Sequence, residues 1–202
     1  MAKLVFKYGV MGSGKTLSLL KEAYNYEKVG KSVVTFAPEK DDRNGVGVIK
    51  TSSGWKRDAI VIGENSSVKD YIINLETKPD AIFVDEAQFF KEEQIFDLAW
   101  IANTMNIPVF CYGLLTDFRC ELFEGSKALT KCASQIITET TVCECGSDAV
   151  VNMRVIDGTV VTEGDQVAIG NVGSMYYPVC HTCYKKYCSG EKKLPQRFMK
   201  TS

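Results

Sequence analysis

The first 140 residues alternate short apolar runs with longer stretches whose apolar residues recur at helical spacing. The apolar runs predict strands at residues 4–8, 32–36, 81–84, 108–112 and 135–138, and shorter strands at 46–49 and 59–62. The longer stretches predict helices at residues 16–29, 68–76, 92–105 and 122–132. This alternation is typical of a mostly parallel sheet with helices on both faces, which binds ligands at the carboxyl edge of its strands.

The pattern changes after Thr141, where short β-like pieces replace the alternation. Residues 149–155 and 159–161 predict a hairpin, because Asp157-Gly158 between them is a strong turn signal. We therefore predict an α/β domain at residues 1–140, a small β-rich lobe at 141–190 and a basic tail at 191–202.

Composition narrows the class of protein. Of the 202 residues, 45% are hydrophobic and 24% are charged, as in a soluble globular protein. A formal net charge of −1 gives no steering toward nucleic acid or an anionic membrane, so we expect neither as a partner. Met1-Ala2-Lys3 leads directly into a strand and no apolar run approaches membrane-spanning length, so we expect a cytoplasmic protein whose eight cysteines are reduced.

The first chemical motif lies between the first predicted strand and the first predicted helix. It fits the P-loop pattern G-x-x-x-x-G-K-[ST] with Gly9, Val10, Met11, Gly12, Ser13, Gly14, Lys15 and Thr16. Such a loop wraps ATP phosphates with its backbone N–H groups, while Lys15 reaches the β- and γ-phosphates and Thr16 ligates Mg²⁺. The alternative is a glycine-rich turn that begins an ordinary helix. The strand–loop–helix context favours a P-loop nucleotide-binding domain.

Two carboxylates follow the apolar run 81–84. Asp85 directly after this run fits the second P-loop element, which holds Mg²⁺ opposite Thr16. Glu86 fits a base that orients water in an ATPase or accepts a hydroxyl proton in a kinase. The alternative for Glu86 is a solvated acid or cap at the start of the next helix. We assign Asp85, Glu86, Ala87 and Gln88 to the ATP site.

Four cysteines form two close pairs in the β-rich lobe, namely Cys143, Cys145, Cys180 and Cys183. Four thiolates at tetrahedral geometry favour a closed structural Zn²⁺ site. Four reduced core thiols are the alternative, and Cys188 or His181 could replace one ligand. Cys111, Cys120 and Cys132 are interpreted as ordinary buried thiols.

These motifs, in this order, resemble the type II thymidine kinases, a zinc-containing tetrameric class. The resemblance covers about residues 3–188. The matching blocks are residues 9–16, Asp41-Asp42-Arg43, 84–90 (Val-Asp-Glu-Ala-Gln-Phe-Phe), 113–119 (Gly-Leu-Leu-Thr-Asp-Phe-Arg), the segment from Glu163 to Tyr176 and the four cysteines.

The resemblance implies transfer of the γ-phosphoryl of MgATP to the 5′-hydroxyl of thymidine, with deoxyuridine as a related substrate. It assigns the base to Glu86, thymine packing to Phe118, and a phosphate-end loop to Asp41 and Arg43. Arg43 or Arg119 could supply further positive charge for the transfer. The alternatives are an ordinary core residue for Phe118 and a surface ion-pair partner for Arg119. The resemblance also implies a substrate-covering loop made of Gln166, Val167, Ala168, Ile169 and Gly170, with Tyr176 near the nucleoside and Tyr177 as its rival. A homotetramer and feedback inhibition by dTTP are also implied.

Two other classes compete with a kinase. An ATPase with a nucleic-acid-binding zinc ribbon needs basic residues on the ribbon, yet Arg154 is the only one between Cys145 and Cys180, against four acidic residues. A structural zinc protein with a vestigial P-loop would not need Lys15 and Glu86. The sequence therefore favours the kinase.

Overall fold

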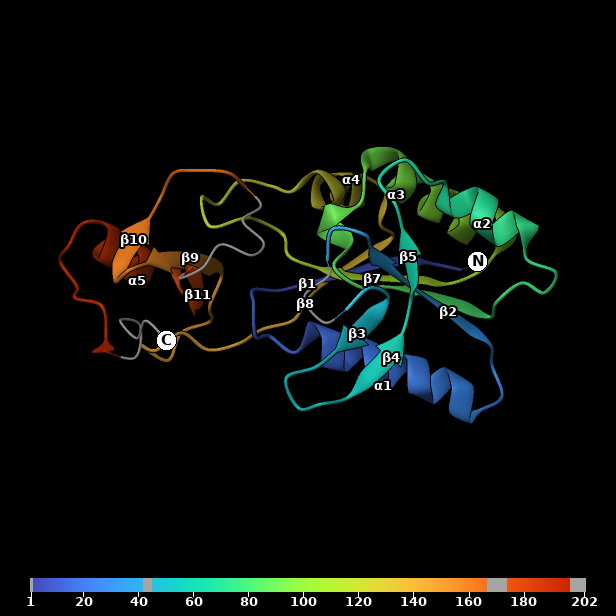
Figure 1. The fold of residues 1–202 in the computed structure, drawn as a ribbon, viewed down its shortest axis with the longest axis horizontal. Coiled ribbons are helices and arrows are strands. Elements are labelled where there is room, and N and C mark those ends of the chain that lie inside the picture. The colour runs from blue at the N-terminus through green and yellow to red at the C-terminus, as the bar shows by residue number, and fades with distance from the viewer. Residues whose placement is uncertain (1, 42–44, 167–173, 197–202) are drawn as a thin grey trace.

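The computed structural model describes residues 2–41, 45–166 and 174–196. Its main element is a six-stranded, all-parallel sheet with the order β5-β2-β6-β7-β1-β8 (Figure 1). The strands are β1 (Leu4–Tyr8), β2 (Val33–Pro38), β5 (Ile60–Ile62), β6 (Ala81–Val84), β7 (Val109–Gly113) and β8 (Gln135–Thr138). The predicted parallel sheet is confirmed.

Side chains of the central strands alternate between the two faces of the sheet. In β6, Ile82 and Val84 join one buried cluster, while Ala81 and Phe83 join a second cluster on the opposite face. All four residues of β6 are fully buried. The uninterrupted apolar run thus marks a strand covered on both sides.

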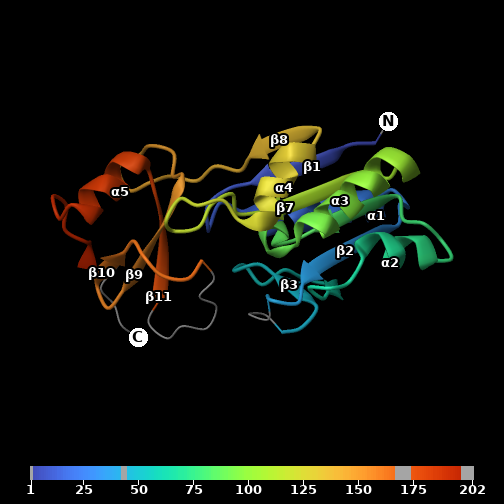
Figure 2. The same cartoon turned by 90° about the horizontal axis from the view of Figure 1, so that it is seen from above.

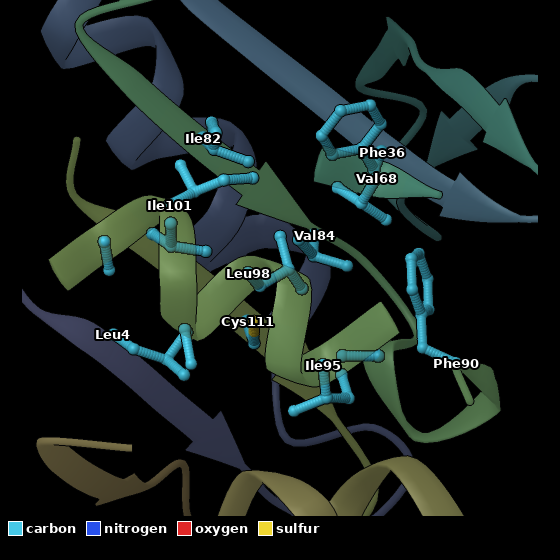
Figure 3. Packing of buried hydrophobic residues seen from close by; sticks show 14 of the residues in the cluster. Leu4, Phe36, Val68, Ile82, Val84, Phe90, Ile95, Leu98, Ile101 and Cys111 are labelled. Atoms are coloured by element: carbon cyan, nitrogen blue, oxygen red, sulfur yellow. The ribbon is translucent and has the colours of Figure 1, made fainter. Parts of the chain in front are cut away.

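Helices cover both faces. The helix α1 (Lys15–Lys28) lies on one face, and α2 (Val68–Asn74), α3 (Glu92–Trp100) and α4 (Glu124–Cys132) lie on the other (Figures 1 and 2). Leu98 and Ile101 pack against Ile82 and Val84 on the face that α2, α3 and α4 cover (Figure 3). A π-helical turn, Ile101–Met105, continues α3, so the two together span the whole of the predicted range 92–105.

Three expectations differ in detail. Residues 46–49 do not join the main sheet; β3 (Val48–Lys50) instead pairs with β4 (Lys56–Asp58) in an antiparallel hairpin. The β4 strand was not predicted, because its sequence Lys-Arg-Asp carries no apolar signal. Helix α2 ends two residues early, and α4 begins at Glu124 because Phe123 has extended backbone and is buried.

A second sheet lies beyond the main one, with the order β10-β9-β11 (Figure 2). It consists of β9 (Val151–Ile156), β10 (Thr159–Val161) and β11 (Ser174–Val179), and α5 (His181–Cys188) follows it. Asp157 and Gly158 both have positive φ, at 47° and 72°, which suits the predicted hairpin turn. Val151, Met153, Val155 and Val179 form its own buried cluster with Tyr187.

Two cysteine expectations are wrong in part. Cys111 is buried as predicted, but Cys120 is exposed and Cys132 is only partly buried. Cys120 lies in a tight loop with a positive φ of 65°, which turns it away from the core. Among the described residues, no helix is long and apolar enough to cross a membrane.

Helix α3 provides a test of the core. Leu98 is fully buried, whereas Phe96 on the same helix is 45% exposed. We expect Leu98→Ala to lower the free energy of unfolding by about 2–5 kcal/mol, because it leaves a cavity against β6. Phe96→Ala should change it by well under half as much. Chemical denaturation of both variants would check this, and equal losses would contradict the packing described.

Candidate active site

The P-loop connects the end of β1 to the start of α1. Gly12 and Gly14 have positive φ values of 75° and 86°, which side chains disfavour, and Gly14 is the N-cap of α1. A Cβ on Gly9 would lie 2.1 Å from the carbonyl oxygen of Glu139. The Lys15 ammonium donates to the carbonyl oxygens of Gly9 and Val10, at 2.9 and 2.8 Å. The loop thus combines left-handed glycines with a lysine folded back onto its carbonyl groups, an arrangement compatible with the P-loop pattern.

Asp85 lies directly after β6, beside the P-loop. Its side chain accepts a hydrogen bond from the Thr16 hydroxyl at 3.4 Å, and only 6% of the residue is exposed. Burial raises the pKa of this carboxyl to about 7, and the nearby carboxylate of Glu86 contributes to the rise, against the opposing charge of Lys15. The oxygen atoms of a buried carboxylate and of a neighbouring hydroxyl are ligands that suit a hard divalent cation.

Glu86 has a left-handed backbone, with φ 47° and ψ 42°. It precedes a 3₁₀ turn, Ala87–Phe89, but makes no side-chain cap to it, so the capping alternative is not supported. Its carboxylate accepts a hydrogen bond from the side-chain amide of Gln88. The carboxylate thus lies at the carboxyl edge of the sheet, one residue beyond Asp85.

One cavity of about 640 Å³ connects these groups to the second sheet. Its lining includes most of the predicted site: Met11, Gly12, Gly14, Lys15, Thr16, Asp41, Asp85, Glu86, Gln88, Phe118, Gln166 and Tyr176. Gly9, Val10, Ser13 and Ala87 support the loop and turn without lining the cavity. Arg43 and the predicted loop residues Val167, Ala168, Ile169 and Gly170 lie outside the described residues.

Part of the cavity lining is aromatic. Phe118 is 1% exposed, so it belongs to the core and also lines the cavity. Its ring has the guanidinium groups of Arg154 and Arg119 at 5.1 and 5.8 Å. Tyr176 lines the cavity from β11, whereas the Tyr177 hydroxyl donates to the sulfur of Met175, which favours Tyr176 of the two.

Arg119 does not face the phosphate end. It forms an ion pair with the buried carboxylate of Asp117 at 2.8 Å and donates to the carbonyl oxygen of Gly164 at 3.0 Å. Gln166 also donates to Asp117, at 3.3 Å. Asp117 therefore links the loop that carries Phe118 to Gln166 directly and to Gly164 through Arg119. A phosphate role for Arg119 is not supported.

Several cavity residues were not predicted. Asn152 on β9 is 4% exposed and accepts a hydrogen bond from the backbone N–H of Met11 at 2.7 Å, which ties the P-loop to the second sheet. Residues of the β3–β4 hairpin, Thr51, Ser52 and Ser53, also line the cavity. Neither group has a motif of its own, because the fold alone brings these residues to the P-loop.

The four predicted cysteines come together at one end of the second sheet. The sulfur atoms of Cys143, Cys145, Cys180 and Cys183 all lie within 4.8 Å of one another, and those of Cys145 and Cys180 are 3.6 Å apart. A tetrahedral Zn²⁺ with four thiolates needs sulfurs about 3.8 Å apart. His181 and Cys188 are not part of the cluster that the described residues form. The geometry therefore fits a closed zinc site.

The surroundings of the cluster shift the pKa values of its thiols in opposite directions. Hydrogen bonds from Ser147 lower the pKa of Cys145 to about 6, whereas burial raises the pKa of Cys183 to about 12. Lys192 donates to the Cys183 sulfur at 3.6 Å. Cys180 is the N-cap of α5, so the positive end of this helix also faces the sulfurs. A cation resolves the repulsion between four adjacent thiolates.

The sheet, the P-loop and the carboxylate pair define a P-loop nucleotide-binding protein with an added cysteine cluster. Comparison with known proteins then gives the family. A family model described as "Thymidine kinase" matches residues 2–184, and the chain belongs to that family.

Curated relatives agree over nearly their whole length. The thymidine kinase of Enterococcus faecalis is 46% identical over 91% of this chain and 95% of its own. That of Lactococcus lactis is 44% identical over 92% of this chain and 98% of its own. Among solved structures, the large terminase of a thermophilic bacteriophage covers 77% of this chain and 50% of its own, with a TM-score of 0.42 and 11% identity. A similarity that low assigns no function.

Asp85 gives a prediction about pH. Its folded pKa of about 7 lies above the ordinary value of 3.8, so the ionised carboxylate destabilises the fold above pH 7, and this cost disappears as the pH falls through that range. In ligand-free protein with EDTA, Asp85→Asn should raise the Tm by several degrees at pH 8.5 and by less at pH 5. Thermal unfolding at both pH values measures this. The exposed control Asp148→Asn should show no such difference, and a lower Tm for Asp85→Asn at pH 8.5 would contradict the burial argument.

The cysteine cluster gives a second prediction. Wild-type protein should contain about one zinc ion per chain, and Cys183→Ser should lose it and unfold at a lower temperature. Cys188→Ser, an exposed thiol on the same helix, should retain the metal. Elemental analysis of the purified proteins checks this, and full zinc content in Cys183→Ser would refute the assignment.

Proposed function

We propose that this chain transfers the γ-phosphoryl group of MgATP to the 5′-hydroxyl of thymidine, which yields dTMP and ADP for DNA precursor synthesis. One observation carries the proposal. A single cavity is lined both by the P-loop and the two carboxylates and by the aromatic residues Phe118 and Tyr176. Such a cavity accommodates a polyphosphate and a nucleoside together.

The phosphate end binds and neutralises ATP. The backbone N–H groups of the P-loop and the ammonium of Lys15 face the phosphates, and the Lys15 contacts with Gly9 and Val10 are exchanged for phosphate oxygens. The hydroxyl of Thr16 and the carboxylate of Asp85, 3.4 Å apart, would hold Mg²⁺. When bound, Mg²⁺ offsets the negative charge that develops on the transferred group. Asp41 lines the same end of the cavity.

Glu86 is the base in this proposal. Its carboxylate takes the proton of the 5′-hydroxyl as that oxygen forms a bond to the γ-phosphorus, while the bond from this phosphorus to the β–γ bridging oxygen breaks. The transfer demands mainly positioning, because the phosphoryl group needs little covalent help from the protein. Glu86 meets this demand, because its backbone is held directly beside Asp85, the proposed metal ligand.

The nucleoside end recognises the base by packing. Phe118 provides a flat apolar surface, and Tyr176 and Gln166 line the cavity around it. Deoxyuridine lacks only the ring methyl group, so we propose it as a second substrate. The main-chain groups of residues 167–170, which the family resemblance assigns to the base edge, belong to this proposal, although they lie outside the described residues.

Four further properties follow from the family and the site. A zinc ion in the cysteine cluster is structural, because four thiolates leave no open position. Reduced thiols favour a cytoplasmic location. We propose a homotetramer, supported by the resemblance to the tetrameric class. We also propose feedback inhibition by dTTP, which could place its base at Phe118 and its triphosphate at the P-loop.

A coupled assay of ADP release from MgATP tests the function. Release should require thymidine in the wild type, and Glu86→Gln should lower kcat by about 10²–10⁴-fold. The exposed control Glu93→Gln on α3 should keep wild-type activity, which separates loss of the base from loss of a surface charge. ADP release that does not depend on thymidine would place the chain among the ATPases and refute the proposal.

A further inference from the structure

We propose that Gln88 is a positioning residue that holds the carboxylate of Glu86 in the orientation needed for proton transfer. The sequence alone assigns Gln88 to ATP binding. In the structure, its side-chain amide lies between the Glu86 carboxylate and the end of β7. This inference rests on the proposed role of Glu86 as the base.

Both polar groups of the Gln88 side chain are engaged. Its amide nitrogen donates to the Glu86 carboxylate, and its amide oxygen accepts the backbone N–H of Leu114 at 3.0 Å. Only 2% of Gln88 is exposed. A buried side chain with one bond to a functional group and one to a rigid strand end acts as a brace.

The brace has a fixed support. Leu114 directly follows β7, and its carbonyl oxygen accepts the hydroxyl of Ser126 on α4 at 2.5 Å. Ser126 is completely buried. The N–H that holds Gln88 therefore belongs to a peptide segment that is itself fixed to the core, so movement of the Gln88 amide is restricted.

Two glycines, Gly113 and Gly125, lie so close to Gln88 that neither position has room for a side chain. A Cβ on Gly113 would lie 2.5 Å from the amide oxygen of Gln88 and 3.1 Å from its backbone nitrogen. A Cβ on Gly125 would lie 3.1 Å from the Gln88 carbonyl oxygen. Close packing on both sides leaves the Gln88 side chain little choice of rotamer.

The backbone of Glu86 explains why a brace is needed. Its left-handed conformation turns the residue out of the β6 direction, away from the neighbours that a strand would give it. A glutamate side chain has several rotatable bonds, and misplacement by about 1 Å can cost a factor of roughly 100 in rate. The Gln88 amide removes much of that freedom while donating to the form that accepts the proton.

Two substitutions of Gln88 test its two hydrogen bonds, and a substitution at another buried glutamine serves as the control. Gln88→Met keeps the volume and removes both hydrogen bonds. Gln88→Glu keeps an acceptor for the Leu114 N–H but places a second carboxylate against Glu86. The matched control is Gln94→Met, because Gln94 is a buried glutamine, 5% exposed, that donates to the carbonyl oxygen of Gly63 and accepts from the Lys91 N–H, away from the cavity.

The test is steady-state kinetics with thymidine and MgATP. We expect Gln88→Met and Gln88→Glu to lower kcat by about 10–100-fold, with the KM of each substrate within about twofold of wild type. Gln94→Met should lower the Tm without lowering kcat. Gly113→Ala should also lower kcat, because its added Cβ displaces the Gln88 amide.

Each other outcome has a distinct meaning. Wild-type kcat in Gln88→Met would overturn the brace while thymidine-dependent turnover and the loss in Glu86→Gln left the kinase proposal standing. An increase in the KM for ATP at unchanged kcat would overturn it in favour of ATP binding by Gln88. A loss of kcat in Gln94→Met equal to that in Gln88→Met would reduce the effect to lost stability. Thymidine-independent turnover in wild type would refute the role of Glu86 as the base and, with it, the positioning role of Gln88.

Discussion

The partly buried contact between the Asp85 carboxylate and the Thr16 hydroxyl joins the two chemical halves of the proposed phosphate site. One partner follows the central strand β6 and the other lies in the first turn of α1, so the contact fixes the P-loop against the sheet. Burial makes the ionised form of Asp85 costly in the free protein, as its raised pKa shows. In the proposed function, a cation and phosphates bound beside this carboxylate would offset that cost, which would couple binding to stability.

The parallel sheet places the remaining groups around that contact. The P-loop, Glu86 and the segment after Gly113 all leave the sheet at its carboxyl edge, where loops rather than core side chains face the ligand. The second sheet closes the cavity through a few polar links. The Met11 N–H donates to Asn152, the Tyr184 hydroxyl donates to the carbonyl oxygen of Phe118, and Arg119 donates to Gly164. These links hold the second sheet and its neighbouring segments against the P-loop and the loop that carries Phe118.

Sequence reasoning predicted the parts of this arrangement whose signals are local. The strands Leu4–Tyr8, Ala81–Val84 and Gln135–Thr138 were predicted to the residue, because each is a bounded apolar run, and the four clustered cysteines were correctly selected. The polar strand β4 was missed because its sequence carries no apolar signal, and the helix α5 was also missed. Asn152 and the bridge from Gln88 to Leu114 were missed for a different reason: each depends on residues far apart in the chain.

The central claim is that Glu86 faces the 5′-oxygen of a nucleoside seated against Phe118. A crystal structure with thymidine, Mg²⁺ and a non-hydrolysable ATP analogue measures this directly. We predict a separation of about 2.6–3.2 Å between a Glu86 carboxylate oxygen and the 5′-oxygen, with thymine packed on the Phe118 ring. A nucleoside bound in this cavity with its 5′-oxygen turned away from Glu86, or with its base away from Phe118, would contradict the account.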